Sequence, residues 1–221
     1  MRITNLRLAR QDRLVFEALN LQSKARRLGL VGPNGAGKSS LLLALQGLES
    51  ASQGSIELEG RPGLLFQNPD HQLLFPTVLE ELCFGAMHRG ELGVESRAKE
   101  LAHAHGASYL LGLATHELSE GQKQLVCLLA VLMDKPDVLL LDEPFAGLDH
   151  RLTAQLMHTL LGLPQRLIMA THRLELLHGF EEVIWIEAGL VQMQGPADAV
   201  VKAYAASGNL SSNPSVATDG T

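Results

Sequence analysis

Cysteine is scarce in this sequence. The 221 residues include only two cysteines, Cys83 and Cys127, and both lie among apolar neighbours. They could form a disulfide only if the fold brought them together, and apolar surroundings are the usual place of a free thiol. We therefore expect two buried thiols and no disulfide framework.

Long apolar segments are also absent. The longest apolar run, LVCLLAVLM at 125–133, has nine residues, whereas a helix that crosses a membrane needs about twenty. The N-terminal segment MRITNLRLARQDR is charged and lacks the apolar stretch of a secretion signal. These absences exclude a membrane-spanning protein and predict a soluble chain in the cytoplasm.

Positive charge is limited too. The net charge is −6, and the longest basic cluster is KARR at 24–27. A broad nucleic-acid-binding surface needs clustered Lys and Arg, so we expect no nucleic-acid partner. What the sequence does contain is 46% apolar residues, which is typical of a globular protein. The chain is also long enough to bury a large core.

Strand signals and helix signals divide the chain into regions. Near the front, RITNLRLA, RRLGLVG, GSIELEG and GLLFQ are typical of β segments separated by turns, and KSSLLLALQGL is typical of a helix that ends at Gly47. Residues 69–118 favour helices, and a further helix is expected from Gln122. Beyond it, the apolar strands DVLLLD, RLIMATH and EVIWIE alternate with helical segments.

This order predicts a single α/β domain over residues 1–206. Strands that alternate with helices form a mostly parallel sheet that is covered on both faces. We expect the core to comprise 1–68 and 134–206, with a helical subdomain at 69–133 inserted between them. The polar, aperiodic residues 207–221 are typical of a disordered tail.

The most specific motif is GPNGAGKS, which follows the apolar strand LGLV and precedes a helix. It fits the phosphate-binding pattern G-x-x-x-x-G-K-[ST] in the required strand-to-helix context. Glycines let backbone N–H groups converge on phosphate oxygens, and the helix start adds its positive end. Lys38 is expected to reach the β- and γ-phosphates, and Ser39 to ligate Mg²⁺. The predicted nucleotide-binding residues of this loop are Gly32, Pro33, Asn34, Gly35, Ala36, Gly37, Lys38, Ser39 and Ser40.

A second candidate group stands at the end of a predicted buried strand. VLLLDEP at 138–144 places Asp142 and Glu143 at the carboxyl end of that strand, which is the edge where open α/β sheets bind ligands. We expect Asp142 to bind Mg²⁺, directly or through water, and Glu143 to act as the general base that activates water. A solvated Asp-Glu turn is the alternative interpretation.

A second glycine turn, LSEGQKQ at 118–124, raises the question of a second anion site. Ser119 can cap a helix, and Gln122 stands three residues further on, as in a capping box. Gly121 leaves the backbone of this first turn open to close approach. By itself, the pattern is equally consistent with an ordinary helix cap.

These motifs occur together in an informative order. GPNGAGKS, Gln67 in LLFQNPD, LSEGQKQ, LLLDEP, AGLD and His172 in MATH follow one another as they do in ATP-binding cassette (ABC) ATPases, which the chain resembles over about residues 28–175. The resemblance implies a P-loop NTPase fold with an antiparallel β N-terminal portion. It also implies that two chains pair head-to-tail, so that the second glycine turn of one chain closes over the ATP held by the other. The residues of that turn are Ser119, Gly121 and Gln122.

The resemblance implies further roles. Gln67 is similar to the glutamine that reaches Mg²⁺ and the attacking water, and His172 to the histidine that contacts the γ-phosphate. The alternatives are a polar strand-end residue and a structural histidine. Asp149 resembles the aspartate that bridges the two subunits, although a helix N-cap is a competing interpretation. Where relatives place an aromatic residue that stacks on adenine, this chain has Arg10, so we expect weak discrimination between ATP and GTP.

Two longer segments, FQNPDHQLLFPTVLEELCFG and LPQRLIMATHRLELLHGFEEVIWIEAGLV, resemble energy-coupling factor ATPases. This implies an ATPase that uses ATP and Mg²⁺ at the inner face of the cell membrane. Its partners would be a second cassette chain, a transmembrane transport component and a substrate-binding membrane subunit. Both motif sets are intact in this chain and permit a homodimer, and a pair of two different cassettes is the alternative. Such importers carry vitamins or Ni²⁺ and Co²⁺, and the compact chain resembles the biotin-type ATPases more than the long paired ones. The alternatives are the ATPase of another importer or exporter, a soluble cassette ATPase, and a P-loop kinase or GTPase.

Overall fold

The computed structural model describes residues 1–10 and 13–208. The predicted disordered tail at 207–221 therefore lies outside the described residues from position 209 onward. Its first residue, Ser207, is instead the C-cap of the last helix, where its hydroxyl donates to the carbonyl of Tyr204 at 2.7 Å.

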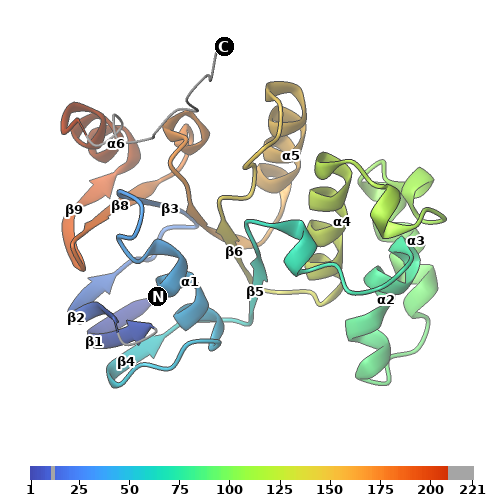
Figure 1. Ribbon diagram of the computed structural model, residues 1–221, viewed down its shortest axis with the longest axis horizontal. Helices are drawn as coiled ribbons and strands as arrows, with labels where there is room; N and C mark the ends of the chain where they lie inside the picture. The colour runs from blue at the N-terminus through green and yellow to red at the C-terminus, as the bar shows by residue number, and fades with distance from the viewer. Residues whose placement is uncertain (11–12, 209–221) are drawn as a thin grey trace, which may run out of the picture.

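Within the described residues, the strands form two sheets (Figure 1). A three-stranded antiparallel sheet has the order β2-β1-β4, and a six-stranded sheet has the order β5-β6-β7-β3-β8-β9. Neighbours in the larger sheet pair in parallel except for β8 and β9. The predicted fold class is confirmed. The strands are β1 Arg2–Arg10, β2 Arg13–Gln22, β3 Arg27–Val31, β4 Gln53–Glu57, β5 Pro62–Leu65, β6 Val138–Asp142, β7 Arg166–Ala170, β8 Glu182–Glu187 and β9 Leu190–Pro196.

Helices α2, α4 and α5 begin at a side-chain cap that the sequence supplies. Thr77, Ser119 and Asp149 each accept a backbone N–H from the first helical turn, which satisfies a donor that the helix itself leaves unpaired. The helix predicted from Gln122 therefore starts earlier, directly after Ser119. The α-helices are α1 Lys38–Gln46, α2 Val78–His88, α3 Val94–Ala104, α4 Glu120–Met133, α5 His150–Gly162 and α6 Ala197–Ala206. Short 3₁₀ helices are η1 Pro69–His71, η2 Ser108–Leu110, η3 Thr115–Glu117 and η4 Leu174–Leu177.

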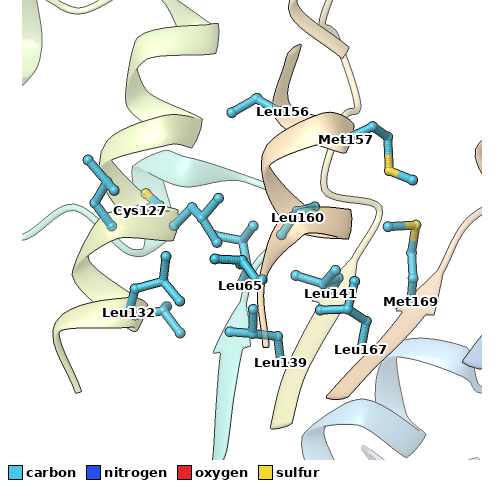
Figure 2. Close-up of a cluster of buried hydrophobic side chains, with 14 of the residues drawn as sticks. Leu65, Cys127, Leu132, Leu139, Leu141, Leu156, Met157, Leu160, Leu167 and Met169 are labelled. Atoms are coloured by element: carbon cyan, nitrogen blue, oxygen red, sulfur yellow. The ribbon is translucent and has the colours of Figure 1, made fainter. Parts of the chain in front are cut away.

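Alternate residues of the central strands enter two separate hydrophobic cores. In β6, Val138 and Leu140 face the core that contains α1 and the small sheet, whereas Leu139 and Leu141 face the core beneath α4 and α5. Figure 2 shows the second core, in which Leu160 of α5 and Cys127 of α4 lie over these strands. A strand that is buried on both faces reads as a continuous apolar run, which is why DVLLLD was recognisable in the sequence.

The segment predicted as a helical subdomain contains η1, α2, α3, η2, η3 and α4. Helices α2 and α3 lie at the far right of Figure 1, beyond α4. Cys83 of α2 and Cys127 of α4 are both free and buried, as expected from their apolar neighbours. Burial raises the pKa of Cys127 to about 12, so this thiol is unreactive at neutral pH.

A buried arginine joins the start of β3 to the end of α5. The guanidinium of Arg27 donates to the carbonyl oxygens of Leu161 at 2.9 Å, Leu163 at 3.1 Å and Gln165 at 2.8 Å. The last carbonyls of a helix have no partner within the helix, so the bonds to Leu161 and Leu163 satisfy acceptors at the end of α5, and the bond to Gln165 holds the segment that follows. The contact fixes the start of the strand that leads to the phosphate loop.

Candidate functional site

The phosphate loop lies between β3 and α1, at the carboxyl edge of the six-stranded sheet. Gly32 has φ 153°, and a Cβ there would collide with the backbone oxygen of Ile186. Gly37 has φ 99° and is the N-cap of α1. Only glycine suits both positions. The ammonium of Lys38 is buried and donates to the carbonyl oxygens of Gly32 at 2.8 Å and Pro33 at 3.1 Å, so its charge is held inside the loop.

Next to the loop, the end of β6 supplies a carboxylate. The hydroxyl of Ser39 donates to Oδ1 of Asp142 at 3.1 Å. Burial raises the pKa of Asp142, and the hydrogen bond from Ser39 partly opposes this shift. Burial also lowers the pKa of Lys38, against the attraction of Glu143 and Asp142. Two oxygen donors at this spacing fit a hard cation such as Mg²⁺, which would offset the cost of burying the carboxylate.

Glu143 is held in an uncommon backbone conformation. Its φ is 44°, in the left-handed region that costs a non-glycine residue about 1–2 kcal/mol. The backbone N–H of Glu143 donates to the carbonyl of Ala170 at 2.9 Å, and its carboxylate Oε2 lies 3.0 Å from Nδ1 of His172. The Glu143 side chain is 14% exposed and that of His172 is 55% exposed. The turn therefore aims a mostly buried carboxylate at an accessible imidazole.

These groups share one cavity of about 980 Å³. The cavity is lined by the predicted residues of the phosphate loop other than Ala36, and by Arg10, Gln67 and the acidic strand end. Ala36 is buried and does not line the cavity. Arg10 also pairs with Glu49 at 3.1 Å, so its guanidinium is engaged by a carboxylate at the cavity edge. Sequence reasoning missed six further lining residues, namely Arg13, Leu14, Val15, Ala188, Gly189 and Tyr204.

Two of these six, Ala188 and Gly189, had a sequence signal that could have been used. Ala188 and Gly189 both have positive φ and join β8 to β9, as expected of a small residue followed by glycine between two strand-like segments. In contrast, Tyr204 lies on the distant α6 and is 2% exposed. Its ring packs edge-on against Trp185 at a centroid distance of 5.3 Å.

The second glycine turn lies elsewhere in the chain. Ser119 and Gln122 form the predicted capping box, with the backbone N–H of Ser119 donating to the side chain of Gln122 at 2.9 Å. Asp149 is the N-cap of α5 and accepts from the N–H of Leu152 at 2.9 Å, so the competing interpretation of this aspartate holds. Among the described residues that line the cavity, none is Ser119, Gly121, Gln122 or Asp149.

An ion pair joins the start of α4 to the segment that follows Gln67. The ammonium of Lys123 lies 2.7 Å from Oδ1 of Asp70 in η1 and 3.4 Å from the carboxylate of Glu120. The hydrogen bond to Asp70 is the main reason why the pKa of Lys123 is raised. Because Asp70 is well exposed, the pair adds little to stability, but it sets the position of one segment against the other.

Comparison with known proteins identifies the family. The model of a family described as ABC transporter matches residues 18–146, which is more than half of the chain. The chain belongs to the family of ABC transporter ATP-binding proteins.

Individual relatives indicate which group within this family the chain is similar to. The biotin transport ATP-binding protein BioM of Rhodobacter capsulatus is 37% identical over 218 residues, covering 92% of this chain and 93% of the relative. The energy-coupling factor transporter ATP-binding protein EcfA of Methanocaldococcus jannaschii is 34% identical, covering 78% and 69%. The structure of cbiO1 from Clostridium perfringens, described as part of the ABC transporter complex cbiONQ, has 28% identity and a TM-score of 0.80, covering 95% and 94%.

Family membership confirms the predicted activity. The chain is an ABC-type ATPase that uses ATP to drive transport, and the predicted resemblance to energy-coupling factor ATPases is confirmed. Among the described residues, no helix combines the length and apolar character needed to cross a bilayer.

Proposed function

We propose that this ABC ATPase powers an energy-coupling factor importer whose cargo is a vitamin, with biotin as the first candidate. The BioM relative of Rhodobacter capsulatus is similar over nearly its whole length, which supports a compact biotin-type ATPase. The observation that carries the enzymatic part is the convergence of Lys38, Ser39, Asp142, Glu143 and His172 on one cavity.

In this proposal the phosphate loop binds ATP. Residues 32–40 surround the phosphates with backbone N–H groups, and Lys38 leaves its two carbonyl partners to pair with phosphate oxygens. Ser39, Asp142 and Gln67 hold Mg²⁺, which supplies charge neutralisation at the phosphates. Arg10 lies at the edge of the same cavity, where it can stack on the base through its guanidinium plane.

Glu143 then acts as the general base. Its carboxylate accepts a proton of the attacking water as the oxygen of that water forms a bond to the γ-phosphorus. The bond between the γ-phosphorus and the bridging oxygen breaks in the same step, so that ADP leaves with the bridging oxygen and inorganic phosphate is formed. His172 is within hydrogen-bond distance of Glu143, so the imidazole holds the carboxylate in place and presents its other nitrogen toward the γ-phosphate. The left-handed backbone of Glu143 fixes the direction in which the carboxylate points.

Two chains complete the site. Ser119, Gly121 and Gln122 lie at the start of α4, where Ser119 is exposed, Gln122 half-buried and Gly121 buried, and all three are outside this chain's own cavity. A head-to-tail homodimer would place that helix start over the nucleotide of the neighbouring chain, with Asp149 at the subunit boundary. Each triphosphate would then accept hydrogen bonds from both chains, and hydrolysis would remove this link and let the chains separate.

The membrane partners bind beyond α4. Four apolar side chains on α2 or in the segment that precedes it are available as a docking surface. Leu74 is 72% exposed, Phe84 45% and Met87 60%, and Phe75 packs on Phe84 at a ring-centroid distance of 4.5 Å. A transmembrane component that docks here would hold the chain at the inner face of the cell membrane. A separate membrane subunit would bind the cargo.

The decisive variant is Glu143→Gln, which keeps the shape of the side chain but cannot accept the proton. We expect it to bind MgATP, to lose at least about 100-fold in kcat, and to accumulate as an ATP-bound dimer in size-exclusion chromatography. Glu95→Gln, an exposed change on α3, is the matched control and should keep full turnover. A Glu143→Gln protein that stays monomeric at saturating MgATP contradicts the two-chain site.

The cargo needs its own measurement. The tagged chain is purified from native membranes, and labelled biotin is added to the complex that comes with it. Binding of biotin by that complex supports the proposal. A complex that binds Co²⁺ or Ni²⁺ and no biotin would contradict the proposed cargo and leave the ATPase assignment intact.

A further inference from the structure

The first turn of α5 contacts two separate parts of the chain. One contact is apolar: Gly121 of α4 is buried against the side chain of Leu152. A Cβ at position 121 would lie 2.7 Å from Cδ1 of Leu152, which is too close, so the leucine side chain would have to move. The start of α4 and the first turn of α5 are therefore in direct contact at Gly121, and a larger side chain at position 121 would displace the end of the Leu152 side chain.

The other contact is polar and lies on the adjacent residue. The hydroxyl of Thr153 is buried and accepts from the guanidinium of Arg173 at 3.2 Å. The backbone N–H of Arg173 donates to the hydroxyl of Thr171 at 3.1 Å. Hydrogen bonds on both sides thus hold the turn that carries His172, and one of them is anchored on α5.

The two contacts share a rigid support. Asp149 caps α5 by accepting the N–H of Leu152, so the residue that packs on Gly121 is also the one fixed by the cap. A capped helical turn moves as a unit, because its backbone hydrogen bonds hold adjacent residues in register. A displacement of Leu152 is therefore passed to Thr153.

We propose that the first turn of α5 is a positioning element for two ATP sites at once. Through Leu152 it sets the position of Gly121, which serves the neighbour's nucleotide, and through Thr153 and Arg173 it sets His172, which serves the chain's own. This inference rests on the proposed two-chain function. Leu152, Thr153 and Arg173 are positioning residues, and coupling of this kind typically amounts to about a 2- to 30-fold change in affinity or rate.

The apolar contact is tested by a double-variant cycle in the Glu143→Gln background. The readout is the MgATP concentration that gives half-maximal dimer in size-exclusion chromatography with light scattering. We expect Gly121→Ala to raise this half-maximal MgATP concentration by about fivefold or more. The combined Gly121→Ala/Leu152→Ala protein should return to within about twofold of Leu152→Ala alone, because the smaller side chain makes room for the new Cβ.

A failure of the double variant to recover would contradict the proposed contact. If Gly121→Ala acts only by blocking the nucleotide, removing the leucine side chain will not restore dimer formation, and the proposed packing role is overturned. Leu161→Ala, at the other end of α5 and 38% exposed, is the matched control and should leave the midpoint unchanged. If Glu143→Gln itself never dimerises, the two-chain function fails instead, and the turnover measurements below still test the Thr153 contact.

The polar contact is tested by turnover of the otherwise unchanged chain. Thr153→Val removes the hydroxyl and keeps the shape, so we expect kcat to fall about fivefold while KM for ATP changes less than twofold. Arg173→Met should give the same loss, the double variant should be no worse than either one, and Arg173→Lys should recover part of the rate. Thr159→Val on the same helix, whose hydroxyl donates to the carbonyl of Gln155, is the control.

Thermal unfolding of each variant separates a positioning effect from a folding effect. A loss of kcat at unchanged unfolding temperature supports the proposal. Unchanged kcat in Thr153→Val, or additive losses in the double variant, would overturn it.

Discussion

Replacing Arg27 by alanine should lower stability strongly without changing catalysis. Its guanidinium makes three hydrogen bonds to carbonyl groups at and just after the end of α5, one fully buried and two partly buried. Hydrogen bonds to a charged group contribute about 1.5–3 kcal/mol each, and water can replace part of the two that are less buried. We therefore expect a loss of about 3–5 kcal/mol in the free energy of unfolding, which corresponds to a drop of roughly 10 °C in Tm for a chain of this size.

The assay is thermal unfolding followed by circular dichroism, with ATPase activity measured at 20 °C. Arg27 stands at the opposite end of β3 from the phosphate loop, so kcat per folded molecule should stay unchanged. Arg27→Lys should recover part of the loss, since an ammonium can reach fewer of the three acceptors. Arg26→Ala, which removes bonds from a more exposed guanidinium, should cost less than about 1 kcal/mol. A Tm change below about 2 °C for Arg27→Ala would refute the reasoning.

Two further predictions concern the cavity. Because burial raises the pKa of Asp142, the folded state binds this proton more tightly than the unfolded state, and stability is lost as pH rises through the raised pKa. Asp142→Asn should therefore raise Tm at pH 7. In acid, where the native aspartate is protonated, the variant and the native protein should have similar Tm values. The variant should also lose turnover. For Arg10, whose side chain pairs with Glu49, we expect kcat/KM for ATP and GTP to agree within about tenfold, and a hundredfold preference for ATP in parallel assays would contradict this.

The sequence predicted those parts of the fold in which local pattern and burial agree. Strand β6 was recognisable because it is buried on both faces, and α1 because Gly47 ends it in a left-handed conformation. Strand β2 was missed, since its buried residues Phe16 and Leu19 are three positions apart and three register shifts interrupt its pairing with β1. That spacing resembles a helical period more than a strand period.

The candidate site likewise contains residues that a local sequence pattern predicts and residues that only the fold reveals. Residues of the phosphate loop and the acidic strand end can be predicted from their residue types and spacing, and the structure brings them into one cavity. Tyr204 reaches that cavity from α6 through tertiary packing, which leaves no local pattern. The contact between Gly121 and Leu152 joins residues that are 31 positions apart in the sequence and lie on two different helices, and only the fold reveals that the glycine packs against this leucine.

The left-handed backbone at Glu143 has a consequence for protein engineering. Asparagine and above all glycine adopt this conformation with less strain than glutamate, so either residue would relax the loop at the position that we assign to proton transfer. A variant library sorted only for heat resistance would thus be expected to accumulate inert proteins with substitutions at this position. Screens on this scaffold need to select for turnover and for melting temperature together.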